Sequence, residues 1–190
     1  MKNPKLFVVS APSGGGKTTI VKAVLQRHPD FEFSVSATTR TRRANEENGK
    51  DYFFLRPEEF ERLIKEHVLV EHEQIYGNYY GTLKSEVDRA LSSGRCMVFD
   101  VDVKGALSIK KLYGTKAVLL FIEPPSIQVL EERLRNRKTE DETTFQKRMA
   151  RATSELEIGK QFDHRIVNNS LARAIDEVDD IIIKQLSSSQ

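Results

Sequence analysis

Residues 8–19 combine glycines, a lysine and threonines in an order that suits phosphate binding, VVSAPSGGGKTT. Apolar residues precede this segment and residues with helical apolar spacing follow it, which predicts a strand, a loop and a helix. Glycines let the loop turn its N–H groups toward anionic oxygens, and the helix N-terminus adds its dipole. The pattern G-x-x-x-x-G-K-[ST] is met at Gly16, Lys17 and Thr18, whereas Ala11 stands at the position of its first glycine.

This loop predicts a site for a nucleoside triphosphate and Mg²⁺. We expect Lys17 to reach the β- and γ-phosphates and the hydroxyl of Thr18 to ligate the metal ion. A flexible glycine loop between a strand and a helix is the alternative, although Gly-Lys-Thr at such a junction favours phosphate binding. The residues predicted to bind the nucleotide here are Ser13, Gly14, Gly15, Gly16, Lys17, Thr18 and Thr19.

Two carboxylates, Asp100 and Asp102, follow the apolar run 97–99. If this run is a central strand, Asp100 lies at the carboxyl edge of the sheet, where ligands bind in open α/β folds. We therefore expect Asp100 to help hold Mg²⁺, usually through water. The two side chains lie two residues apart, so along an extended chain they face the same side. The alternative is a pair of acids that face solvent.

Arginines occur in three groups that could surround phosphates. Arg40 and Arg43 lie in a polar loop, Arg133 and Arg137 are four residues apart on one helical face, and Arg148 lies on the next helix. Guanidinium groups suit bidentate capture of phosphate oxygens. Each of these arginines could instead be a solvated surface charge.

The composition is that of an ordinary globular protein. Its 190 residues include 38% hydrophobic and 31% charged residues, and the net charge of +2 is too small to indicate nucleic-acid binding. One cysteine, Cys96, excludes an internal disulfide and fits a reducing compartment. The apolar run 6–9 is too short to span a membrane. We expect a cytoplasmic protein without nucleic-acid or membrane partners.

Alternating strand and helix patterns must position these residues. They predict a parallel, doubly wound α/β sheet. Its expected strands are 6–9, 96–101, 117–122 and 164–167, and its expected helices are 17–28, 84–92, 105–112, 127–135, a long one through 145–156, and 171–182. The helices 127–135 and 145–156 flank a polar tip, 139–144, and could move as a pair.

Residues 31–83 do not continue this alternation of strands and helices, which indicates an inserted subdomain. We expect short strands at 31–37, 52–55 and 68–75, a polar loop at 38–51, a helix that begins at Pro57, and an aromatic-rich turn at 76–81.

Together these motifs resemble those of guanylate kinase, the family that transfers the γ-phosphate of ATP to GMP. The resemblance covers nearly the whole chain. It rests on the segments Ser10–Thr18, Ser36–Arg40, Gly49–Tyr52, Gly77–Thr82, Asp100–Asp102, Arg133 with Arg137, and Ile166–Asn168.

The resemblance implies the fold of a P-loop nucleoside monophosphate kinase in three parts. A nucleotide-binding core comprises residues 1–31, 84–125 and 157–190. A mixed α/β GMP-binding insertion comprises residues 32–83, and a helical lid comprises residues 126–156.

The resemblance also implies roles for individual residues. Guanine has adjacent N–H donors at N1 and its amino group, so its pocket needs carboxylates, for which Glu71 and Asp102 are expected. Ser36 and Thr82 are expected near guanine O6, and Asn168 near the nucleotide. The expected GMP-phosphate ligands are Arg40, Arg43, Tyr52 and Tyr80, and the expected catalytic residues are Lys17, Arg133, Arg137 and Arg148. The acceptor is already anionic, so we expect no general base.

Some positions depart from the family pattern, and some alternatives stay open. Arg42 stands where a proline is common, Asn45 where glycine is usual, and Asn169 where an acid is usual. A kinase of another nucleoside monophosphate and a non-catalytic guanylate-kinase-like interaction module are the rival hypotheses. The sequence does not decide between GMP and dGMP as preferred acceptor, or between a monomer and a homo-oligomer.

Overall fold

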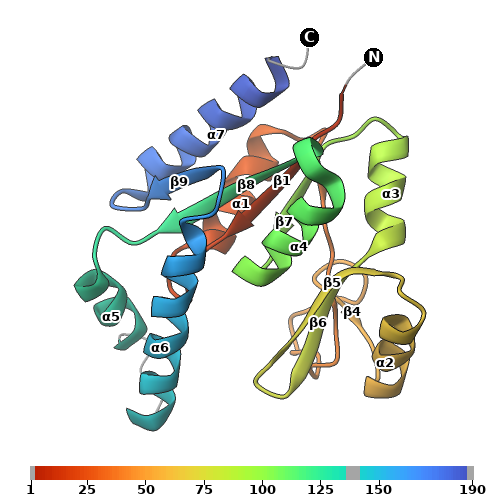
Figure 1. Ribbon diagram of the computed structural model, residues 1–190, viewed down its shortest axis with the longest axis horizontal. Coiled ribbons are helices and arrows are strands. Elements are labelled where there is room, and N and C mark those ends of the chain that lie inside the picture. The colour runs from red at the N-terminus through yellow and green to blue at the C-terminus, as the bar shows by residue number, and fades with distance from the viewer. Residues whose placement is uncertain (1–2, 136–141, 188–190) are drawn as a thin grey trace.

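The computed structural model describes residues 3–135 and 142–187 (Figure 1). Arg137 and residues 139–141 of the predicted polar tip lie outside the described residues. No helix within these two described ranges combines the length and the apolar character needed to cross a membrane.

The core sheet is parallel, as predicted. The central strand β1 pairs with β7 on one side and with β8 on the other, so that Leu6 lies between Met97 and Ala117. Among the described residues the order across the sheet is β2 (Glu32–Phe33), β7 (Met97–Asp100), β1 (Leu6–Ser10), β8 (Ala117–Glu123) and β9 (His164–Val167).

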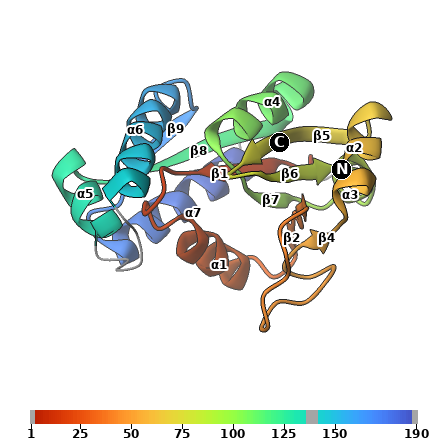
Figure 2. The ribbon, with the colours of Figure 1, turned by 90° about the horizontal axis from the view of Figure 1, so that it is seen from below.

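Helices cover both faces of this sheet, which confirms the doubly wound arrangement (Figure 2). Leu6 and Val8 pack toward one face and Phe7 and Val9 toward the other, because successive side chains of a strand alternate. The first face is covered by α3 (Lys84–Ser92), α4 (Val103–Tyr113) and part of α6 (Glu142–Gly159). The second face is covered by α1 (Lys17–Arg27) and α7 (Leu171–Ser187). The short helix η1 (Gly114–Lys116) precedes β8, and α5 (Ile127–Arg135) follows it.

A smaller mixed sheet lies within the predicted insertion. Its order is β4 (Phe53–Phe54), β3 (Ala37–Thr38), β6 (Asn78–Leu83) and β5 (Leu69–Ile75). The helix α2 (Pro57–Lys65) begins with a proline at its first turn, and Glu59 accepts a hydrogen bond from the N–H of Arg56 at 2.8 Å.

The structure corrects two sequence predictions in this region. The predicted strand 31–37 is divided, because β2 pairs with β7 in the core sheet and β3 pairs with β6 in the second sheet. The predicted turn 76–81 is mostly strand β6. Only Tyr76 and Gly77 make the reversal, with φ angles of 49° and 81°, as a two-residue hairpin turn requires.

Candidate functional site

The loop between β1 and α1 exposes N–H groups at a helix N-terminus. Gly14 and Gly16 have φ angles of 88° and 90°, which glycine adopts without strain. Among the described residues, no side chain caps α1. The first-turn N–H groups of α1 therefore remain available to an anion, and the helix dipole favours negative charge there.

Asn168 and Arg133 tie this loop to the end of β9. The side chain of Asn168 is buried and donates a hydrogen bond to the Gly15 carbonyl at 2.9 Å. Arg133, on α5, donates to the backbone carbonyl of Asn168 at 3.0 Å. A Cβ atom on Gly16 would lie 2.6 Å from the Asn168 amide nitrogen. Asn168, predicted to bind the nucleotide, thus contacts the phosphate loop itself.

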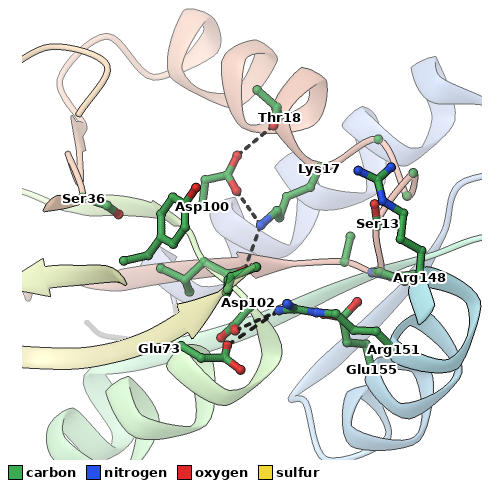
Figure 3. A pocket seen from close by; sticks show the side chains of 18 of the residues that line it. Ser13, Lys17, Thr18, Ser36, Glu73, Asp100, Asp102, Arg148, Arg151 and Glu155 are labelled. Carbon is green, nitrogen blue, oxygen red and sulfur yellow. Dashed lines mark hydrogen bonds and ion pairs between the residues drawn. The ribbon is translucent and has the colours of Figure 1, made fainter. Parts of the chain in front are cut away.

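Asp100 joins the two residues that follow the glycines. The ammonium group of Lys17 lies 2.5 Å from one oxygen of Asp100 and donates to the carbonyl of Val101 at 2.9 Å (Figure 3). The hydroxyl of Thr18 donates to the other oxygen of Asp100 at 3.0 Å. Lysine, hydroxyl and carboxylate therefore meet where the triphosphate is expected.

Thr18 and Asp100 suit Mg²⁺, which is often coordinated by only one or two protein groups. They are too few for a metal ion whose ligands all come from the protein. Mg²⁺ prefers oxygen ligands and often takes one or two protein groups together with water and substrate phosphate. Within residues 3–135 and 142–187, no group of three or more His, Cys, Asp or Glu side chains could hold a metal ion. The oxygen pair at Thr18 and Asp100 therefore fits an ion that arrives with phosphate and water ligands.

A cavity of about 430 Å³ extends from this loop to the second sheet and α6. Fourteen of the predicted site residues line it, so most of them share one space despite their separation in the sequence. They are Ser13, Gly14, Gly15, Gly16, Lys17, Thr18, Thr19, Ser36, Tyr52, Glu71, Tyr80, Asp100, Asp102 and Arg148.

Glu71 is a buried carboxyl group in the wall of this cavity. Its Oε1 accepts a hydrogen bond from the buried hydroxyl of Thr82 at 2.7 Å. A Cβ atom at Gly105 would lie 2.7 Å from Glu71 Oε2, so this glycine of α4 leaves room for the carboxyl group. Burial raises the pKa of Glu71 to about 7, and the charge of Asp102 acts in the same direction. Near neutral pH a ligand with N–H donors would favour its ionised form.

Two of the predicted phosphate ligands, Tyr80 and Arg40, lie beside a third, Tyr52. The Tyr80 ring meets the Tyr52 ring edge-on with centroids 6.1 Å apart, and the guanidinium carbon of Arg40 lies 5.4 Å from the Tyr52 centroid. Arg40 makes a bidentate contact with Glu46 at 2.7 and 3.0 Å. The exposed Arg43 donates its backbone N–H to the same carboxylate at 2.8 Å. Arg40 and Arg43 are not among the described residues that line the cavity.

Three further charged residues line the cavity, and the motifs in the sequence do not single them out: Glu73, Arg151 and Glu155. A signal for them nevertheless exists. Glu73 is two residues from Glu71 on one strand, and Arg151 and Glu155 are three and seven residues beyond Arg148 on one helix. These spacings put each of them on the same face as a predicted site residue.

Comparisons with known proteins show which proteins this chain is similar to. A family model described as guanylate kinase matches residues 3–185. A guanylate kinase of Chlorobium chlorochromatii (strain CaD3) is 50% identical over 179 residues, which cover 94% of each chain. One of Porphyromonas gingivalis (strain ATCC BAA-308 / W83) is 46% identical and covers 92% of this chain and 94% of its own. The crystal structure of guanylate kinase from Anaplasma phagocytophilum is similar with a TM-score of 0.78 and 27% identity, over 98% of this chain and 88% of its own.

Proposed function

Because the chain belongs to the guanylate kinase family, we propose that it transfers the γ-phosphate of ATP to GMP, forming ADP and GDP. One observation carries this proposal. A single cavity is lined both by a phosphate-binding loop with its lysine and by the carboxyl groups of Glu71 and Asp102. A donor triphosphate and an acceptor with N–H donors can therefore occupy the same space.

The acids account for the choice of base. Guanine presents its N1–H and its amino group side by side, and Glu71 and Asp102 accept hydrogen bonds from them. Adenine presents a lone pair at N1, which a carboxylate repels. The hydroxyl of Ser36 supplies a donor for guanine O6. The single proton of the Thr82 hydroxyl is donated to Glu71, so Thr82 acts by holding that carboxyl group in place. We propose that both GMP and dGMP are acceptors, since they carry the same base.

The insertion holds the phosphate of GMP in this proposal. Arg40, Arg43, Tyr52 and Tyr80 are the proposed ligands, and Glu46 keeps the guanidinium of Arg40 in place through its bidentate contact. Burial raises the pKa of the Tyr52 phenol, so the group stays protonated and can donate a hydrogen bond to a phosphate oxygen.

The proposed transfer is direct and in line. The acceptor oxygen of GMP is anionic, so the enzyme needs no general base and acts by position and charge. Lys17 exchanges its contact with Asp100 for the β- and γ-phosphate oxygens, and Arg133, Arg137 and Arg148 balance the charge on the transferring group. Thr18 and Asp100 would hold Mg²⁺, which when bound supplies positive charge at the phosphate oxygens.

A coupled assay of ADP release tests this function. We expect ATP turnover with GMP and dGMP, and at most weak turnover with AMP, dTMP and UMP. A preference for AMP would contradict the role of the two acids. An absence of turnover with every acceptor would favour the non-catalytic interaction module.

A further inference from the structure

One arginine of helix α6 contacts carboxylates from three parts of the molecule. Arg151 Nη2 lies 3.4 Å from Asp102 Oδ2, at the start of α4, and 3.7 Å from Glu73 Oε2, on β5. Its Nε donates to Glu155 Oε1, one turn later on α6, at 2.8 Å. Figure 3 shows the guanidinium group directed at the carboxylates of Glu73 and Asp102.

These contacts leave Asp102 held at both oxygens. Its Oδ1 accepts a hydrogen bond from the Gly105 N–H at 2.7 Å and so caps α4, while its Oδ2 faces Arg151. Each carboxylate oxygen still has a lone pair for another donor. Without Arg151, the carboxylate would depend mainly on the cap at Gly105, and its plane could rotate about that bond.

Arg151 is itself held in place. Glu155 is only 7% exposed, and its bond to Nε fixes the plane of the guanidinium group. Lys104 lies 3.3 Å from the other oxygen of Glu73, so the acids around Arg151 are partly neutralised from a second side. A cavity of about 190 Å³ lined by Glu73, Asp102, Arg151 and Glu155 adjoins the group.

We propose that Arg151 is a positioning residue for guanine: it orients the Asp102 carboxylate toward the base, so that the lid helix α6 contributes to the affinity for GMP. This inference rests on the proposed function. Arg148 lies one turn earlier on α6. Like Arg151, it lines the cavity of about 430 Å³, where we assign it to the transferring phosphate. One helix would thus serve the base through Arg151 and the reaction through Arg148.

The test compares Arg151→Met with Arg148→Met and with Lys160→Met by steady-state kinetics. Lys160 is the matched control, because it is an exposed cation directly after α6 whose partner at 2.6 Å is Glu157. Because Arg151 is 29% exposed, its hydrogen bonds to charged groups should lie at the weak end of the usual range. We therefore expect Arg151→Met to increase KM for GMP about tenfold. In this variant KM for ATP and kcat should stay within about twofold. Arg148→Met should mainly lower kcat, and Lys160→Met should change neither constant.

A double-mutant cycle with Asp102→Asn tests whether Arg151 acts through that carboxylate. In the Asp102→Asn background, we expect Arg151→Met to raise KM for GMP by less than about twofold. If the full factor persists there, or if KM for GMP and KM for ATP rise together, the inference is wrong.

Two conservative variants keep the test decisive if Arg151→Met fails to fold. Arg151→Lys retains the charge and should restore part of the affinity for GMP, while Glu155→Gln should raise KM for GMP a few fold. If the wild type is active and KM for GMP is unchanged in both variants, the role of Arg151 is wrong while the proposed function stands. An inactive wild type would instead contradict the proposed function.

Discussion

Lys17 is the residue on which the proposed transfer depends most, because its ammonium group lies at the loop and already contacts Asp100 at 2.5 Å. We expect Lys17→Ala to lower kcat with GMP by roughly 10² to 10³, as loss of one preorganised charge typically does. Steady-state ADP release measures this. Lys22→Ala, at an exposed lysine of the same helix, is the control and should be neutral. Near-normal turnover of Lys17→Ala would contradict the mechanism.

Glu71 is the residue whose ionisation should set the pH dependence. Burial raises its pKa to about 7, Asp102 adds to this, and Thr82 and Lys17 oppose it. Guanine N–H groups bind the ionised form, so kcat/KM for GMP should rise with pH as Glu71 of the free enzyme ionises, and level off above pH 8 or so. Glu71→Gln should remove the part of this rise that comes from Glu71 and increase KM for GMP roughly 10- to 100-fold.

The phosphate of GMP titrates as well, with a pKa of about 6. Its contribution is common to wild type and Glu71→Gln, so the difference between the two pH profiles isolates Glu71. If the pH profiles of kcat/KM for wild type and Glu71→Gln are parallel, the ionisation of Glu71 does not control the binding of guanine. The same raised pKa lets the native state bind more protons than the unfolded state between about pH 4.5 and pH 7. The contribution of Glu71 to the free energy of unfolding should therefore fall as pH rises through that window.

At the scale of elements, the phosphate loop and the end of β9 form one unit. Gly16 lies at a φ of 90°, and its missing Cβ makes room for the amide of Asn168, which in turn holds the Gly15 carbonyl. This contact joins residues far apart in the sequence, so the shape of the loop depends on how β9 pairs with β8.

Gly16→Ala tests this unit. We expect it to reduce the free energy of unfolding by about 2 kcal/mol or more, because backbone strain and the clash with Asn168 add, and to raise KM for ATP. Gly94→Ala is the matched control. Its φ is 69°, but a Cβ atom there would meet nothing within 4 Å, so only the strain of about 1 kcal/mol remains. If urea unfolding shows the same loss of unfolding free energy in both variants, the clash with Asn168 is relieved at no cost.

At the scale of the whole molecule, the cavity lies where the core sheet, the second sheet and α6 meet. GMP would contact Glu71 and Tyr80 of the second sheet and Asp102 of the core together. A ligand that contacts several parts stabilises all of them against unfolding, since it binds the native state alone.

Thermal unfolding measures this linkage. GMP at 100 times its Kd should add about 2.7 kcal/mol and raise Tm by roughly 5 to 11 °C in a chain of this size. AMP at the same concentration should raise Tm much less, and Glu71→Gln should reduce the shift with GMP. Equal shifts with GMP and AMP would contradict base selection by the acids.

Much of the fold and part of the site could be predicted from the order of residues. The apolar run of β1 and the helical spacing of α1 can be recognised within a few residues, and the alternation of such strands and helices along the chain predicted the doubly wound core correctly. The division of 31–37 between β2 and β3 could not be read locally, because each half pairs with a different distant strand. The turn predicted at 76–81 was too long, because its restriction to Tyr76 and Gly77 needs a positive φ at a tyrosine, which tyrosine rarely adopts.

The sequence by itself determined the family, the phosphate loop and the chemical types of the site residues, because these follow from short motifs and from side-chain chemistry. The tertiary structure alone decided which of these polar and charged groups meet. It paired Arg40 with Glu46, Asn168 with Gly15, and Arg151 with Glu73 and Asp102. Ion pairs and buried hydrogen bonds act over a few ångströms in space, and residues as far apart as Asp102 and Arg151 come within that range only when α6 packs beside α4.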